Sequence, residues 1–148
     1  MAKFTYTIQT KVSPEKVWAA LTEFGSRREE IWPDLTPGSF NLMELGETSA
    51  IAREGTVSLG IWVVEHYDWS QPGVVIAVSG QSNVVAPGGE WRTDIKPRGD
   101  GGTIITVSMD RRALGWRGRL LHGLFQVTGG RILAMRMRTM LSRLNAQA

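Results

Sequence analysis

The stretch that decides the fold spans residues 3–24 and reads KFTYTIQTKVSPEKVWAALTEF. In its first ten residues, polar side chains lie between apolar ones that fall on one side of an extended chain, namely Phe4, Tyr6, Ile8 and Val12. A period of two residues is typical of a strand with one buried face. The sequence therefore predicts a strand over residues 3–12.

The next twelve residues change to helical spacing. Ser13 suits the N-cap position, and Pro14 suits the first helical position because its missing N–H would be unpaired there in any case. Apolar residues then recur on one face of a helix at Val17, Leu21 and Phe24. We predict a helix from Pro14 to Phe24, closed by Gly25. A second short helix is expected in residues 26–33, where Pro33 ends it.

From Gly38 to Asp110 the pattern is that of strands separated by turns. Six β-branched or aromatic runs alternate with turn sequences such as SLG, QPG, APGG and RGDGG. The runs cover residues 39–45, 49–56, 61–70, 73–85, 90–98 and 102–112. With the helical segment that follows, this order predicts an α+β architecture with about seven antiparallel strands and a long C-terminal helix. A chain of 148 residues fits one domain, over residues 1–148.

Composition excludes several kinds of site. The chain has no cysteine and two histidines, so we expect neither a disulfide, nor a metal site, nor a bound cofactor. The net charge of +3 is modest, which argues against a nucleic-acid partner. The first residues carry no apolar signal segment, so the expected location is cytoplasmic.

The order of elements and several motifs resemble the START-like superfamily, also called SRPBCC or helix-grip proteins, which includes polyketide cyclases and lipid-transfer domains. The resemblance covers essentially the whole chain and rests on VSPEKVWAALTEF, EHYDWSQPG, SNVVAPGGEW and the final helix. It implies a seven-stranded antiparallel sheet curved around the C-terminal helix, with an apolar cavity between them. The fold alone does not assign a reaction.

Strand alternation selects the residues expected to face such a cavity. In the run 61–69 the phase is ambiguous, because either Trp62, Val64, His66 and Asp68 or the other five residues could point inward. The candidates for ligand contact are Tyr6, Trp62, His66, Trp91, Ile105, Val107, Met109, Leu133 and Met137.

Few residues suggest chemistry. His66 and Tyr67 are weak catalytic candidates, since a histidine titrates near neutrality and no catalytic triad is recognisable. Arg53, Glu54 and Asp110 could hold buried charge, although the Asp110–Arg112 run is more simply a solvated turn. An arginine-rich stretch around Trp116, over residues 111–119, could instead contact a phosphate, a carboxylate or an anionic membrane surface.

The C-terminal segment 120–144 is too rich in arginine for a membrane span, although an interfacial helix remains an alternative. Its stripe from Leu133 to Leu144 does not continue across Gly129-Gly130, which predicts a break there or a continuous helix opened for a ligand. The leading hypothesis is binding or carriage of a small hydrophobic molecule such as a lipid, polyketide or aromatic compound. The alternatives are a polyketide cyclase or dehydratase, and a peripheral membrane or protein-interaction module. Nothing in the sequence indicates the oligomeric state.

Overall fold

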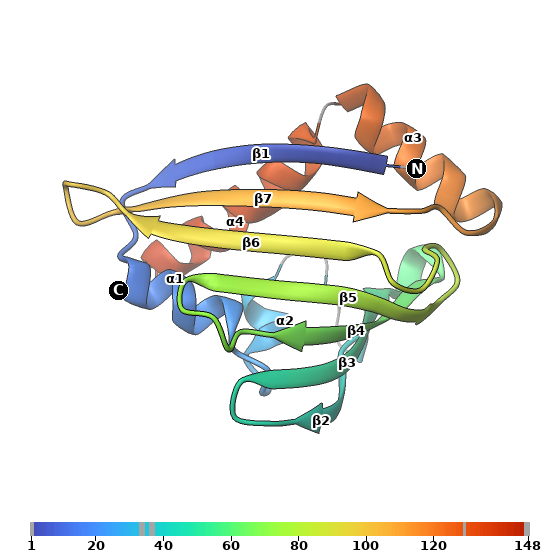
Figure 1. Ribbon diagram of the computed structural model, residues 1–148, viewed down its shortest axis with the longest axis horizontal. Helices are drawn as coiled ribbons and strands as arrows, with labels where there is room; N and C mark the ends of the chain where they lie inside the picture. Colours follow the sequence, from blue (N-terminus) through green and yellow to red (C-terminus); the bar gives the residue numbers. More distant parts are fainter. Residues whose placement is uncertain (1, 33–34, 36–37, 129, 147–148) are drawn as a thin grey trace.

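The computed structural model describes residues 2–32, 35, 38–128 and 130–146. Seven strands form one antiparallel sheet in the order β1-β7-β6-β5-β4-β3-β2 (Figure 1). The strands are β1 (Ala2–Thr10), β2 (Asn41–Leu45), β3 (Ser49–Thr56), β4 (Ile61–Asp68), β5 (Val74–Ser82), β6 (Glu90–Pro97) and β7 (Thr103–Arg111). The helices are α1 (Pro14–Leu21), α2 (Arg28–Ile31), the 3₁₀ helix η1 (Val57–Leu59), α3 (Gly115–Thr128) and α4 (Arg131–Ala146). The predicted α+β architecture with seven strands is confirmed.

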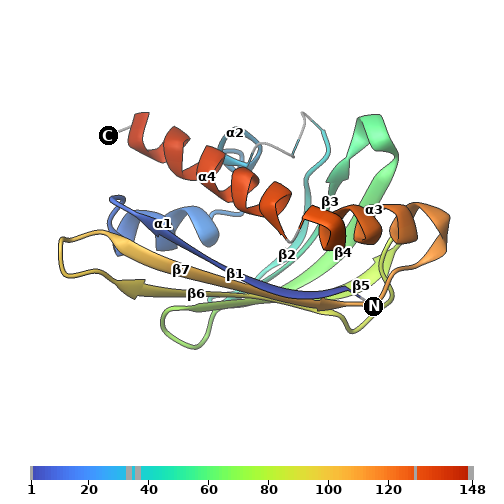
Figure 2. The same cartoon turned by 90° about the horizontal axis from the view of Figure 1, so that it is seen from above.

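The sheet curves, and all four α-helices lie on its concave side (Figure 2). The first strand, β1, pairs with the last strand, β7, at one edge of the sheet. Ala2 lies opposite Arg111, and Thr10 lies opposite Thr103. A hairpin meander from β2 to β7 makes every other pairing. This topology places both the N-terminal strand and the C-terminal helices at the same edge of the concave face.

Helix α1 begins as its sequence predicts and ends early. The Ser13 hydroxyl oxygen accepts a hydrogen bond from the Lys16 N–H, and Pro14 occupies the first turn. The helix stops at Leu21 rather than Phe24, because Thr22 leaves helical geometry and its hydroxyl donates to the Trp18 carbonyl at 2.8 Å. Phe24 is nevertheless buried, and its ring stacks on Trp69 at 5.2 Å between centroids.

Of the two alternatives for the C-terminal helical segment, the structure shows the break. Helix α3 ends at Thr128, α4 begins at Arg131, and Gly130 between them has φ = 80°. Glycine reaches this left-handed conformation without the steric cost of a side chain. The other glycine of the predicted pair, Gly129, lies outside the described residues. Among the described residues, no helix combines the length and the apolar character that a bilayer crossing requires.

The core lies between α4 and the β1–β7 half of the sheet. Helix α4 buries Leu133, Met137, Met140 and Leu141, which belong to the predicted stripe from Leu133 to Leu144. It packs on Ile8, Ile105 and Val107, which the sequence placed on inward strand faces, and on Val17 of α1. Most side chains of this core are aliphatic or thioether groups, joined by Trp32 and by partly buried aromatic residues such as Tyr6. Their close packing stabilises the β1–β7 half of the fold.

Candidate functional site

A cavity of about 460 Å³ lies between helices α3 and α4 and the other half of the sheet. Its wall is mostly apolar and combines the inner faces of β3 to β7 with side chains from α1, α2, α3 and α4. A volume of this size falls in the range of pockets that hold small organic ligands. Helices α3 and α4 meet at an angle on the concave side of the sheet (Figure 2), and both contribute side chains to the cavity wall.

Strand β4 faces the cavity with Ile61, Val63, Glu65 and Tyr67. The placement of Trp62 and His66 inside the cavity was therefore wrong. His66 is exposed on the opposite face, beside Gly80. Successive side chains of a strand point to opposite faces, so a shift of one residue exchanges the inner and outer residues. Both alternating sets of β4 contain apolar and polar residues, and the inner set includes the carboxylate of Glu65, so apolarity alone did not identify the inner face.

Four of the remaining candidates line the cavity, namely Trp91, Met109, Leu133 and Met137. The other three, Tyr6, Ile105 and Val107, belong to the core beneath α4. Tyr6 donates its hydroxyl hydrogen to the Leu133 carbonyl at 3.4 Å, and burial raises its pKa to about 12. These three side chains pack under the helix because β1 and the middle of β7 lie where α4 touches the sheet.

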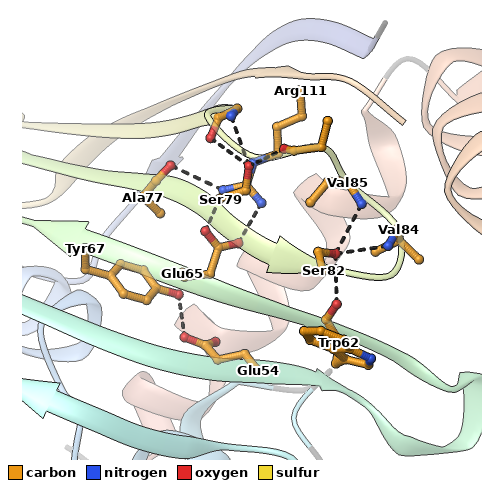
Figure 3. A network of polar contacts seen from close by, with 12 residues as sticks. Glu54, Trp62, Glu65, Tyr67, Ala77, Ser79, Ser82, Val84, Val85 and Arg111 are labelled. Carbon is orange, nitrogen blue, oxygen red and sulfur yellow. Dashed lines mark hydrogen bonds and ion pairs between the residues drawn. The ribbon is translucent and has the colours of Figure 1, made fainter. Parts of the chain in front are cut away.

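A polar cluster formed by Arg28, Glu54 and Tyr67 sits at one end of the cavity wall. Arg28 Nη2 donates to Glu54 Oε1 at 3.2 Å and to the Tyr67 hydroxyl at 3.0 Å. Tyr67 in turn donates its hydroxyl hydrogen to Glu54 Oε1 (Figure 3). Arg28 and Glu54 are both buried, so the prediction that Glu54 holds buried charge is confirmed, and its partner comes from the short helix α2.

The environment of this cluster sets the protonation states. Burial raises the pKa of the Tyr67 hydroxyl well above its ordinary value, and the negative charge of Glu54 adds to the shift. Burial alone would lower the pKa of the Arg28 guanidinium, but Tyr67 and Glu54 together more than offset this effect and raise it. Arg28 therefore stays charged, and Tyr67 stays protonated and able to donate a hydrogen bond.

A second ion pair joins Arg111 at the end of β7 to Glu65 in the middle of β4. The two guanidinium nitrogens Nη1 and Nη2 reach the two Glu65 oxygens at 2.6 and 2.7 Å, and Nη2 also donates to the Ala77 carbonyl at 3.2 Å (Figure 3). Both side chains are buried. The interpretation of Asp110–Arg112 as a solvated turn was thus wrong for Arg111, whereas Asp110 and Arg112 are exposed.

His122 is a residue that the sequence did not single out for this cavity. It lies on the inner side of α3, is 5% exposed and lines the cavity. Burial lowers the pKa of its imidazole, and the nearby Arg111 charge acts in the same direction. Its Nδ1 atom is buried without a hydrogen-bond partner among the described residues. A neutral imidazole with a free ring nitrogen therefore faces the cavity.

Acid should destabilise the protein through His122. Because the pKa of the folded-state imidazole is lowered, the unfolded chain binds more protons below about pH 6.5, the ordinary pKa of histidine. The free energy of unfolding is expected to fall as the pH drops through this value toward 5. In a His122→Gln variant this part of the loss should be absent. Urea unfolding of both proteins at several pH values measures it, and parallel curves would contradict the assignment.

The exposed His66 provides the matched control for the pH experiment. His66→Gln removes an imidazole from the outer face of the same half of the sheet. The pH dependence of its stability below about 6.5 should stay close to that of the wild type, because this variant keeps the buried His122.

The sequence model of the family described as "Polyketide cyclase / dehydrase and lipid transport" matches residues 1–148. The chain belongs to this family. Among solved structures, a START superfamily protein from Mycobacterium smegmatis superposes with a TM-score of 0.77 at 13% identity, covering 100% of each chain. The Zhui aromatase/cyclase from Streptomyces sp. R1128 gives a TM-score of 0.73 at 12% identity, covering 97% of this chain and 93% of that one.

Norcoclaurine synthase from Thalictrum flavum, in complex with dopamine and hydroxybenzaldehyde, gives a TM-score of 0.71 at 11% identity over 98% of this chain and 86% of that one. No curated protein matches the chain in sequence. At these identities the structural likeness establishes the helix-grip fold and leaves the activity open.

No metal centre emerges from the part of the chain that the structure describes, because it contains no group of three or more His, Asp or Glu side chains able to hold an ion. The carboxylates nearest the cavity, Glu54 and Glu65, are each bonded to an arginine. The polar groups of the cavity wall include Tyr67, His122, Arg136 and the two ion pairs, which can form hydrogen bonds.

Proposed function

We propose that this protein binds and carries a small, mostly apolar molecule that has at least one hydroxyl or carbonyl group. The observation that carries the proposal is the cavity of about 460 Å³, whose apolar wall contains two internally neutralised ion pairs and an unpartnered imidazole nitrogen. Pockets for small ligands combine a mostly apolar wall with a few placed polar groups in this way.

The two ion pairs of the wall favour a neutral ligand group beside them over a charged one, whereas Arg136 lines the cavity over the Trp32 and Trp91 rings. Arg28 and Arg111 each already have a carboxylate partner, so neither presents an uncompensated charge to the cavity. Four buried nitrogen atoms of the lining residues lack a hydrogen-bond partner among the described residues, namely Trp32 Nε1, His122 Nδ1 and the Nε atoms of Arg28 and Arg111. A ligand hydroxyl or carbonyl that bonded to them would remove the cost of leaving them unpaired.

Aromatic phenols and aldehydes are the first ligands to test. Distant relatives in fold include an aromatase/cyclase and a synthase that was crystallised with dopamine and hydroxybenzaldehyde. In this chain the Trp32 and Trp91 rings lie in the cavity wall, where flat apolar surfaces suit an aromatic ring. A lipid chain is the competing apolar ligand, and native mass spectrometry of the purified protein distinguishes the two by mass.

Filling the cavity should abolish binding. Val63→Trp adds an indole to the inward face of β4, whereas Val64→Trp adds the same group to the outer face one residue further along. We expect Val63→Trp to weaken binding of the neutral fluorescent probe 1-aminoanthracene by about tenfold or more, equivalent to about 1.4 kcal/mol. Fluorescence titration measures this. Equal loss in both variants, or no binding by the wild type, would contradict the proposal.

A second candidate function is enzymatic, of the polyketide cyclase or dehydratase type. Its specific support is that a protonated hydroxyl, Tyr67, and a neutral imidazole, His122, line the same cavity. Such a pair can supply a proton donor and a proton acceptor to one substrate.

The enzymatic candidate is tested by turnover of a phenolic aldehyde or polyketide-like substrate by the wild type. Tyr67→Phe and His122→Gln should each reduce the rate of such a reaction by about a hundredfold or more. His66→Ala, on the outer face, should leave it unchanged. Wild-type turnover that survives both cavity substitutions would remove Tyr67 and His122 from any mechanism. The cytoplasmic location stays a prediction, which cell fractionation tests.

A further inference from the structure

Helix α3 has two apolar faces, although it covers the sheet with only one. At 100° per residue, Gly118, Leu121 and Phe125 form the face that turns toward the sheet and the cavity. On the opposite side lies a stripe of exposed apolar side chains, which we call the outer stripe. Its members and exposed fractions are Trp116 70%, Leu120 70%, Leu124 47% and Val127 87%.

The outer stripe is narrow and continuous. Helical geometry puts its four members within about 80° of one another, so they form a single ridge along the outside of α3. Arg117 and Arg119 are exposed on either flank of the ridge. Single exposed apolar residues are ordinary on a protein surface, but a continuous apolar ridge with charged flanks marks an interaction site.

The mouth of the cavity lies beside the outer stripe. Leu59 of η1 and Ile132 at the start of α4 both line the cavity and are exposed, at 59% and 38%. The η1 turn approaches α3 closely, because a side chain added at Gly60 would lie 3.7 Å from the Arg117 guanidinium. Exposed apolar side chains of η1 and α4 therefore line the cavity next to the two ends of α3.

Charge is distributed very unevenly along the chain. All 14 acidic residues lie at or before Asp110, whereas the last 38 residues contain eight arginines and no acidic residue. Five of these arginines are exposed, at positions 112, 117, 119, 131 and 138. The modest net charge of +3 thus conceals a strongly cationic C-terminal region.

We propose that the outer stripe of α3 docks on the surface of an anionic lipid bilayer and turns the cavity mouth toward it. An apolar stripe with a tryptophan, flanked by cations and free of carboxylates, is the arrangement by which an interfacial helix binds. The arginines attract the anionic headgroups, and the four apolar side chains enter the region between headgroups and acyl chains. Docking needs neither a ligand in the cavity nor catalysis, so it stands independently of the proposed function.

The test is co-sedimentation with vesicles of phosphatidylglycerol and phosphatidylcholine, compared with phosphatidylcholine alone. The wild type should bind the anionic vesicles at low salt and lose most binding at high salt, because screening weakens the headgroup attraction. Leu120→Glu should weaken binding by at least about tenfold. It removes a leucine side chain that would enter the bilayer, and it adds a negative charge that the anionic headgroups repel.

Leu45→Glu is the matched control. Leu45 is 58% exposed on the edge strand β2, so the substitution changes charge and apolarity equally but away from α3. It should lower binding much less than Leu120→Glu does. Circular dichroism of each variant establishes that the fold persists. Equal binding by the two variants, or equal binding to neutral and anionic vesicles, would overturn the proposal.

The contribution of the exposed arginines of the C-terminal region is tested separately. The double variant Arg119→Gln/Arg131→Gln should reduce binding and its salt dependence, whereas Lys11→Gln/Lys96→Gln removes the same charge from exposed positions elsewhere and should do so less. Analytical ultracentrifugation decides between a membrane and a second copy of this chain. A wild-type dimer that Leu120→Glu dissociates, with no vesicle binding, would assign the outer stripe to self-association and overturn membrane docking.

Discussion

Replacing Arg111 with methionine is expected to lower the free energy of unfolding by about 3–5 kcal/mol. Methionine has a similar length, but it leaves Glu65 as a buried carboxylate that has lost its two hydrogen bonds, at 2.6 and 2.7 Å. Such a charge keeps its desolvation cost and loses its compensation. Urea unfolding followed by circular dichroism measures the change. The adjacent Arg112 is exposed, so Arg112→Met should change stability by less than about 0.5 kcal/mol.

The double variant Arg111→Met/Glu65→Leu shows what the ion pair is for. Replacing both partners with apolar side chains removes the uncompensated charge, so stability should return close to that of the wild type. If the pair helps to orient a ligand in the cavity, this stable variant should still lose affinity for a polar aromatic compound. Failure of the double variant to recover stability would contradict the assignment of the single-variant loss to an unpaired Glu65.

Gly118→Ala is also expected to destabilise the protein strongly, with a loss of about 1–3 kcal/mol or more. A Cβ atom at this position would overlap the Val84 carbonyl oxygen, which also accepts a hydrogen bond from the Leu114 N–H at 2.8 Å. Backbone on both sides cannot shift as a flexible side chain could. Helix α3 would have to move away from the loop between β5 and β6, carrying His122 and the cavity wall with it.

Gly123→Ala is the internal control for that change. It lies five residues along the same helix, and an added Cβ would meet no atom within 4 Å. Alanine is the better helix former by about 1 kcal/mol, so this variant should be slightly more stable than the wild type. Thermal unfolding of both variants gives the comparison. Similar losses at the two positions would mean that α3 is not packed closely against Val84.

Strand β4 could be predicted from the sequence in its bounds but not in which of its faces points inward. Its strand character and its bounds follow from β-branched and aromatic residues, and the observed Ile61–Asp68 lies within the predicted run 61–70. Its inward face could not be chosen, because the inward set contains Glu65, whose carboxylate is tolerated inside only through Arg111, 46 residues away. The carboxylate of Glu65 shares a strand face with Val63 and Tyr67, and this was the one feature of the sequence that indicated a buried cation as its partner.

The order of elements, the cap of α1 and the apolar stripe of α4 can be predicted from the chain alone, because they depend on neighbours a few residues apart. The glycine pair limited the C-terminal segment to two alternatives, and the structure shows that the segment breaks. Tertiary structure alone decided the cavity and its chemistry. Arg28 meets Glu54, Arg111 meets Glu65 and His122 turns inward because the sheet curves and brings remote strands beneath α3. Pairings over such separations leave no local periodicity in the chain, so only the folded molecule reveals them.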